Sequence, residues 1–173
     1  RNGYALHLAA EMPAGLRDLS IVRIAPPYEL KRTLTVETCA NHFKYGYTVA
    51  SRTACANAVA ENLNILVWNW DPTCSSCKAS DYLPPSAITG YKIYSYNEGD
   101  LPALVATTTD GPWQTVFFMP QGAPSESVPW HYFVRAYSGS YSSPKSNVHT
   151  WTSLGEGILT LFVSPTVSFT EAK

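Results

Sequence analysis

The stretch Leu66-Val67-Trp68-Asn69-Trp70, followed by Asp71-Pro72, decides the fold of this 173-residue chain. Its side chains alternate, so that Leu66, Trp68 and Trp70 face one side of an extended strand. The proline ends the run, because proline cannot donate a hydrogen bond within a central strand. We therefore predict a β-strand with one large aromatic face.

Two later runs alternate in the same way. They are Ile88-Thr89-Gly90-Tyr91-Lys92-Ile93-Tyr94 and Trp130-His131-Tyr132-Phe133-Val134-Arg135-Ala136, and Ser138-Gly139-Ser140 forms a turn after the second. Together the three runs predict a sheet protein with one shared core. The predicted core signature consists of Trp70, Tyr91, Ile93, Val134 and Ala136.

These motifs resemble the fibronectin type III family. The resemblance rests on a tryptophan two residues before a proline, on Gly-Tyr-x-Ile, on aromatic-x-aromatic-x-Val-x-Ala, and on the Ser-Ser-Pro-Lys-Ser-Asn that opens the last strand. It implies an all-β, immunoglobulin-like sandwich over residues 62–153. Residues 54–63 leave little room for a separate first strand of that sandwich. The family serves adhesion, spacing and enzyme-accessory roles, so the fold alone does not fix a function.

Residues 1–61 contain a weaker echo of the same pattern. Gly3-Tyr4-Ala5-Leu6 parallels Gly90-Tyr91-Lys92-Ile93, residues 45–51 parallel residues 130–136, and residues 30–37 fall where the preceding strand belongs. This predicts a partial module with strands C to G and an uncovered apolar face. Alternatively, residues 1–61 are an unrelated extension, or the chain is a piece of a longer polypeptide.

The C-terminal residues 154–173 contain two short strand-like runs, 158–163 and 166–169. We predict that this tail completes a module, either within its own chain or in a neighbouring copy by strand addition. Repeated head to tail, the second arrangement builds a filament.

Composition narrows the classes of partner. Charged residues make up 14% of the chain and the formal net charge is −1, which disfavours nucleic acid and anionic membrane surfaces as partners. No stretch approaches the roughly 20 apolar residues of a membrane span. We expect protein partners, including the chain itself, with carbohydrate as a further candidate. The start at Arg1 fits a mature product that has lost a leader peptide, and equally a trimmed fragment.

The four cysteines are Cys39, Cys55, Cys74 and Cys77. Three connectivities are open, and we favour Cys39 with Cys55 and Cys74 with Cys77. The Cys74-Ser75-Ser76-Cys77 motif is interpreted as a structural clip, with a zinc half-site and a redox pair as alternatives. Disulfides are typical of an extracellular or cell-surface protein.

Candidate catalytic groups are scattered. No histidine belongs to a recognisable hydrolase motif such as G-x-S-x-G, and no calcium loop is present. The carboxylates of Asp71, Asp81, Glu98, Asp100 and Asp110 lie in or beside loops, where they are ordinarily solvated turn formers. We therefore predict no catalytic residue, no metal site and no cofactor.

Four tyrosines form the candidate binding surface: Tyr94, Tyr96, Tyr137 and Tyr141. Tyrosine combines a rigid apolar ring with a polar tip, which suits contact with protein or carbohydrate. Ordinary cross-strand pairing is the alternative. Taken together, the sequence predicts a non-enzymatic, secreted structural or adhesive surface protein. The alternative is an accessory or spacer module of a larger extracellular enzyme.

Overall fold

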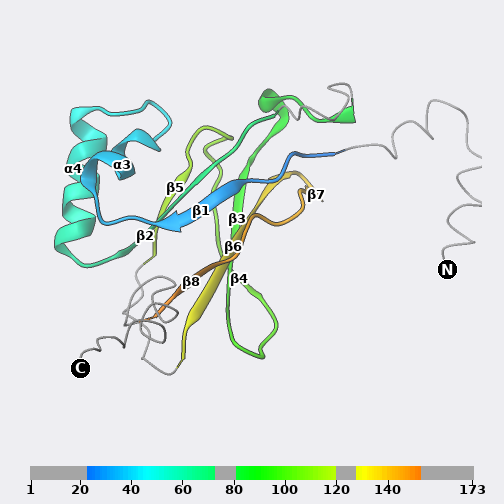
Figure 1. The fold of residues 1–173 in the computed structure, drawn as a ribbon. Helices are drawn as coiled ribbons and strands as arrows, with labels where there is room; N and C mark the ends of the chain where they lie inside the picture. Colours follow the sequence, from blue (N-terminus) through cyan, green and yellow to red (C-terminus); the bar gives the residue numbers. More distant parts are fainter. Residues whose placement is uncertain (1–22, 73–80, 120–127, 153–173) are drawn as a thin grey trace, which may run out of the picture.

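The computed structural model describes residues 23–72, 81–119 and 128–152 and contains two antiparallel sheets (Figure 1). The first sheet has the order β1-β2-β5, with β1 Tyr28–Arg32, β2 Asn64–Asn69 and β5 Val116–Met119. The second has the order β4-β3-β6-β7, and β8 also pairs with β6. Its strands are β3 Gly90–Asn97, β4 Ala103–Thr107, β6 Trp130–Ser138, β7 Tyr141–Ser142 and β8 His149–Trp151, preceded by a 3-10 turn at Pro85–Ala87. The predicted all-β sandwich is confirmed.

The main hydrophobic core lies between the two sheets. Trp68 of β2 meets Tyr91 of β3 edge to face, with ring centroids 5.1 Å apart. Trp70, just after β2, donates from its indole Nε1 to the carbonyl oxygen of Ala25 over 2.7 Å. All five residues of the predicted core signature are buried here, together with Leu66 and Tyr132.

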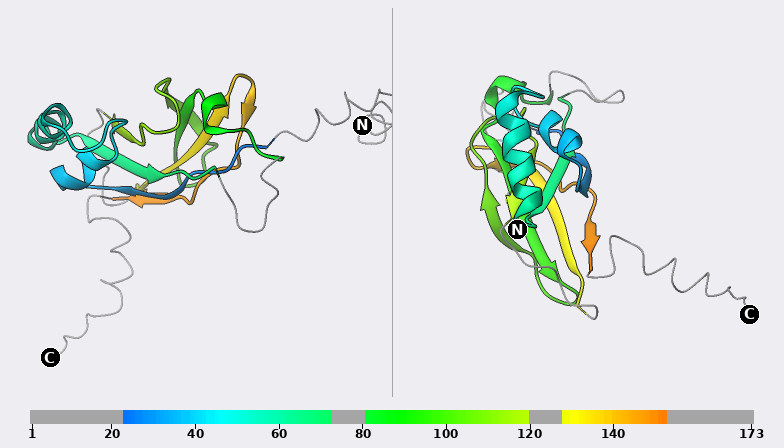
Figure 2. Two further views of the ribbon diagram at one scale, coloured as in Figure 1. Left: turned by 90° about the horizontal axis from the view of Figure 1, so that it is seen from above. Right: turned by 90° about the vertical axis from the view of Figure 1, so that its left-hand side faces the viewer.

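Strand β2 is buried on both faces. Leu66 and Trp68 point into the sandwich, whereas Ile65 and Val67 point into a second core on the outer side of the same sheet. This second core is completed by two helices, α3 Val36–Asn41 and α4 Val49–Ala60, which contribute Cys39, Ala40, Cys55 and Ala58. Figures 1 and 2 show both helices on one side of the molecule, beside β1 and β2. The helices therefore cover the second apolar face of β2.

These helices correct the prediction of strands C to G in residues 1–61. Residues 45–51 do not form a strand, because Thr48 caps α4 in a reciprocal capping box with Ser51. The following alanines favour helix. Asn62 has φ +58° just after the helix, which suits the left-handed position that ends it. Gly3-Tyr4-Ala5-Leu6 and the tail strands 158–163 and 166–169 lie outside the described residues.

Strand β1 belongs to the same sandwich and not to a separate module. It pairs antiparallel with β2, and an irregularity in their register coincides with the positive φ of Glu29, as in a β-bulge. It thus supplies the first strand for which residues 54–63 left no room. Asn147 clamps β1 to the second sheet: Leu30 N donates to Asn147 Oδ1 over 2.8 Å, and Asn147 Nδ2 donates to Leu30 O over 3.0 Å.

The described helices can be compared with the length and apolarity of a membrane-spanning helix. None of its helices is both long and apolar enough to cross a membrane.

Gly90 explains the glycine of the Gly-Tyr-x-Ile motif. A Cβ at this position would lie 2.0 Å from the carbonyl oxygen of Thr108, so the β3 backbone approaches the end of β4 too closely for a side chain. We expect Gly90→Ala to lower the free energy of unfolding by about 1–3 kcal/mol, the usual cost of overpacking. Urea unfolding measures this change. Thr89→Ala, at the neighbouring exposed position, is the control, and equal effects of the two variants would contradict the steric explanation.

Candidate binding groove

A groove surrounds the connection between β4 and β5. It consists of three adjoining hollows of about 420, 500 and 460 Å³, each within the usual size of a ligand pocket. Asp110 lines all three, Phe43 and Gln114 line the first two, and Lys44 lines the second and third. We call this feature the Asp110 groove. One wall is the β4–β5 connection, residues 108–115. The other is mainly the α3–α4 loop, residues 43–48, with Pro85, Ser86 and Ile88 added in the third hollow.

Hydrogen bonds hold the two walls together. Thr115 N donates to His42 O over 2.9 Å, and Lys44 N donates to Gln114 Oε1 over 2.7 Å. The imidazole Nδ1 of His42 is 2.9 Å from Thr115 Oγ1. The helical insertion is therefore joined to the sandwich at the groove itself.

Two tyrosine hydroxyls support the β4–β5 connection from the sandwich side. Tyr91 donates to Pro112 O, and Tyr137 donates to Thr108 O over 2.9 Å. Burial raises the pKa of Tyr91, which keeps its hydroxyl protonated as a donor. Gly111 N adds a bond to Thr89 O at 2.9 Å. The connection is thus anchored on both sides and presents its remaining groups to the groove.

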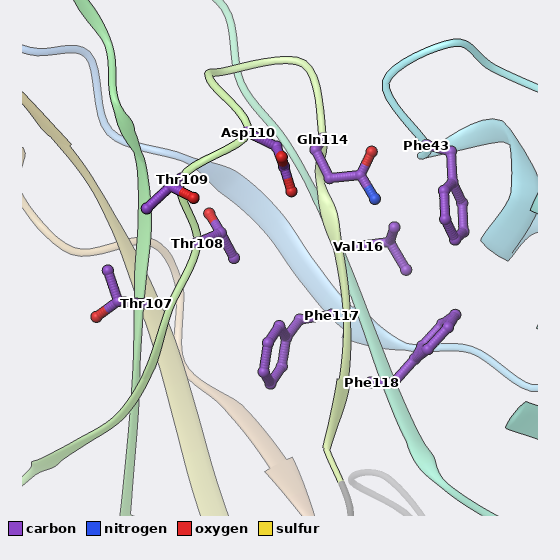
Figure 3. Close-up of a pocket in the computed structure, with 9 residues that line it drawn as sticks. All are labelled: Phe43, Thr107, Thr108, Thr109, Asp110, Gln114, Val116, Phe117 and Phe118. Atoms are coloured by element: carbon purple, nitrogen blue, oxygen red, sulfur yellow. The ribbon is translucent and has the colours of Figure 1, made fainter. Parts of the chain in front are cut away.

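Polar and apolar side chains are separated within the first hollow. Figure 3 shows Asp110 and Gln114 side by side at one end, with Val116, Phe117 and Phe118 toward the other. Phe43 comes from the helical insertion and lies 6.0 Å from Phe118, centroid to centroid. A ligand here would meet hydrogen-bonding groups along one edge and apolar rings along another.

Two exposed rings extend this apolar character into the neighbouring hollows. Tyr45 lines the second hollow and is 81% exposed, and Trp113 lines the third and is 50% exposed. The inner edge of Trp113 is fixed against the buried Trp70, with centroids 5.9 Å apart. Partly exposed aromatic rings of this kind are frequent contact residues in binding sites.

The register places Tyr94, Tyr96 and Tyr137 on the outer face of the second sheet, opposite the core residues Ile93 and Ala136, but it does not bring all four predicted binding tyrosines together. Tyr94 stacks on Phe133 at 4.9 Å and Tyr96 stacks on His131 at 4.9 Å, both as cross-strand pairs of β3 and β6. Tyr137, expected to be exposed, is 8% exposed, because its ring packs beneath Lys92 and its hydroxyl bonds Thr108. Tyr141 pairs with Ser138 in β7, which places it on the other face of the sheet from Tyr137. Their described contacts are those of sheet pairing and loop support.

The cysteines join the two helices of the insertion. Cys39 of α3 and Cys55 of α4 form a disulfide, the pairing that the sequence favoured. Cys74 and Cys77 lie outside the described residues. Within residues 23–72, 81–119 and 128–152, no cluster of three or more His, Cys, Asp or Glu side chains is arranged to hold a metal ion.

Sequence reasoning missed the groove. It placed Tyr45 in a strand, took Asp110 for a solvated turn residue and gave no role to Lys44, Gln114 or Trp113. The one local signal is Asp110-Gly111-Pro112-Trp113, where a large aromatic ring stands in a turn that a core would not require. The pairing of this turn with residues 42–48 has no signal in the sequence.

Comparisons with known proteins concern the fold. No protein-family model and no curated protein matches the chain. Among solved structures, an Fn3-like protein from Clostridium thermocellum is 16% identical with a TM-score of 0.41, covering 73% of this chain and 91% of that one. A myokine is 11% identical with a TM-score of 0.40, covering 75% and 96%. A human fibronectin type III domain is 18% identical with a TM-score of 0.34, covering 62% and 83%. The sandwich fold itself is established by the two antiparallel sheets and the core between them.

His42 makes the junction between helices and sheet sensitive to acid. Burial lowers its pKa below the ordinary value of 6.5, the charge of Lys31 adds to this effect, and a hydrogen bond with the Trp68 backbone opposes it. The unfolded chain therefore binds the proton more readily, so the stability from neutral His42 is present above about pH 6.5 and is lost as the pH falls below it. We expect His42→Asn, which retains a polar group but does not titrate, to flatten this part of the stability profile in urea unfolding between pH 7.5 and 5. An unchanged profile would contradict the assignment.

The Cys39–Cys55 bridge spans 16 residues, a loop size for which chain entropy gives about 3 kcal/mol of stabilisation. We expect the double variant Cys39→Ala, Cys55→Ala to lose stability of that order. Its hydrogen exchange, compared with that of the parent, should accelerate more in α3 and α4 than in β3 and β6. Substitution is preferable to a reducing agent, because it changes only this bridge. Uniform acceleration of exchange over the whole sandwich would show that the bridge does not act locally.

Proposed function

We propose that this chain is a non-catalytic recognition module of the adhesive or structural class, that it acts outside the cell, and that the Asp110 groove is its contact surface. The observation that carries the proposal is the helical insertion between β1 and β2. A disulfide joins the two helices of the insertion, and hydrogen bonds fix the insertion against the β4–β5 connection. The junction presents Phe43, Tyr45 and Trp113 beside polar groups. Preorganised surfaces of this kind lose little entropy on binding.

The chemistry of the groove favours contact over catalysis. Its charged groups are Asp110 and Lys44, of opposite sign, and among its several hydroxyls that of Ser51 is engaged in the cap of α4. Nucleophilic catalysis would need a nucleophile hydrogen-bonded to a base that activates it, and that base hydrogen-bonded to a group that orients it. The described lining supports binding by stacking and hydrogen bonds.

The extracellular location is supported by the cysteine chemistry. Disulfides persist in oxidising compartments and are rare in the cytosol, and the Cys39–Cys55 bridge is buried in the second core.

A second candidate role is assembly by strand addition, and a specific observation favours it. Strand β4 is an edge of the second sheet and carries no charged side chain, and Leu101, Leu104 and Val105 beside or within it are 90%, 50% and 43% exposed. Charges and prolines normally protect such an edge against pairing with another chain. A structural protein that assembles into a filament could use β4 as the acceptor for a strand of a neighbouring copy.

The adhesive role is tested by removing the two exposed rings of the groove. We expect the double variant Tyr45→Ala, Trp113→Ala to bind at least about tenfold more weakly than the parent to a panel of immobilised extracellular-matrix proteins and polysaccharides, because exposed aromatic anchors are typical hot spots. Surface plasmon resonance measures the affinities. Tyr141→Ala, 51% exposed on the distant β6–β7 hairpin, is the matched control. Equal losses for both variants, or no binding by the parent, would refute the proposal.

A further inference from the structure

The groove holds a hydrogen-bond donor and an acceptor that the described protein does not use. Gln114 Oε1 accepts from Lys44 N over 2.7 Å, which fixes the orientation of the side-chain amide. Its Nε2 and the carboxylate of Asp110 have no hydrogen-bond partner among the described residues. Figure 3 shows the two groups next to each other at the polar end of the first hollow. A ligand at this end would meet a held amide donor and a carboxylate acceptor together.

This pair of groups selects among ligand classes. An ammonium group would satisfy Asp110 but would leave the amide hydrogens without an acceptor. A carboxylate or phosphate would satisfy the amide but would meet the negative charge of Asp110. A hydroxyl group can donate to Asp110 while a neighbouring hydroxyl accepts from Gln114, so adjacent hydroxyls match both groups.

The apolar side of the hollow places a second requirement on the ligand, in addition to the adjacent hydroxyls. Phe43, Phe117 and Phe118 are each partly exposed and line the hollow with Val116. A ligand with hydroxyls along one edge and an apolar C–H face fits such a lining, because the rings cover the apolar face while the polar edge keeps its hydrogen bonds. A sugar ring has this division of surface.

The arrangement of the hollows indicates a chain and not a single ring. Asp110 lines all three hollows, and the second and third carry the exposed rings of Tyr45 and Trp113. Lys44 lines the second and third hollows and balances the charge of Asp110. We propose that the Asp110 groove binds a neutral oligosaccharide, with Asp110 accepting from one hydroxyl and Gln114 Nε2 donating to its neighbour. This inference rests on the proposed recognition function and names its ligand class.

Two nearly isosteric substitutions test the proposal. Gln114→Glu keeps an oxygen that accepts from Lys44 N but replaces the amide donor by a second acceptor. Asp110→Asn removes the charge but keeps the shape of the turn. Asp100→Asn, an exposed carboxylate in the turn between β3 and β4, is the matched control. The probes are neutral tetrasaccharides of β-1,4-glucose, α-1,4-glucose, β-1,4-N-acetylglucosamine and α-mannose, together with tetralysine and tetraglutamate.

Isothermal titration calorimetry measures affinity, and ¹⁵N–¹H spectra locate the bound probe. We expect at least one tetrasaccharide to shift the amide signals of residues 43–48 and 108–115. Gln114→Glu and Asp110→Asn should each weaken this binding by about tenfold, the size of a charge-assisted or fixed hydrogen bond. Asp100→Asn should leave it unchanged.

Three results would overturn the inference. The first is that no tetrasaccharide binds at the groove. The second is that one binds there but is insensitive to both isosteric substitutions. The third is that tetralysine or tetraglutamate binds at the groove of the parent more tightly than any tetrasaccharide, since that would show a site for charged ligands.

Failure of the sugar inference remains distinguishable from failure of the recognition function. If no sugar binds but the Tyr45→Ala, Trp113→Ala variant still loses affinity for a matrix protein, the groove is a protein-contact site. If the parent binds no immobilised matrix component and no probe, both proposals fail.

Discussion

The structure depends on the burial of β2 from both sides. Four successive apolar residues, Ile65-Leu66-Val67-Trp68, are all fully buried, and alternate ones enter different cores. One core lies between the sheets, as in any sandwich. The other would leave apolar surface in contact with water unless something covered it, and the α3–α4 insertion is that cover. The requirement to shield Ile65 and Val67 therefore places a helical element on this sandwich.

Packing of the α3–α4 insertion on the sheet also forms the groove. Once the helices pack on β2 and β5, the loop between them lies against the β4–β5 connection, and Thr115 and Gln114 bond its backbone. The disulfide holds one wall from the side of the helices, and the hydroxyls of Tyr91 and Tyr137 hold the other from the sandwich. The disulfide and the two tyrosines do not themselves line the hollows, whereas Gln114 both joins the walls and faces the ligand. This separation between supporting and contacting residues is what preorganises a binding site.

The sandwich was largely predictable from the sequence, and the site was not. Alternation around Trp68, Ile93 and Val134 specifies strands because one face of each must be buried, and these predictions are confirmed. The prediction of a strand at residues 45–51 was wrong, because a short alternating run of aromatic and apolar residues also occurs at a helix N-terminus. The capping pair Thr48 and Ser51 was the stronger signal. The unbroken apolar run Ile65–Trp68 is also typical of a strand buried on both faces, a signal that the prediction from alternation did not use. The groove joins loops some seventy residues apart through backbone and side-chain hydrogen bonds, and a pairing over that separation leaves no local pattern in the sequence.

The clamp between Asn147 and Leu30 gives the fold a defined response to tension. β1 enters the sandwich and β8 leaves it, and a single side-chain amide bonds both backbone groups of Leu30 across the gap between the sheets. A force that pulls the segments beyond β1 and β8 apart loads these two bonds at the same moment, so they share the load instead of opening one after the other. Asn147 therefore resists such a force together with the ladders that pair β1 with β2 and β8 with β6, whereas the groove is lined by β5 and the β4–β5 connection, beyond β2 from β1.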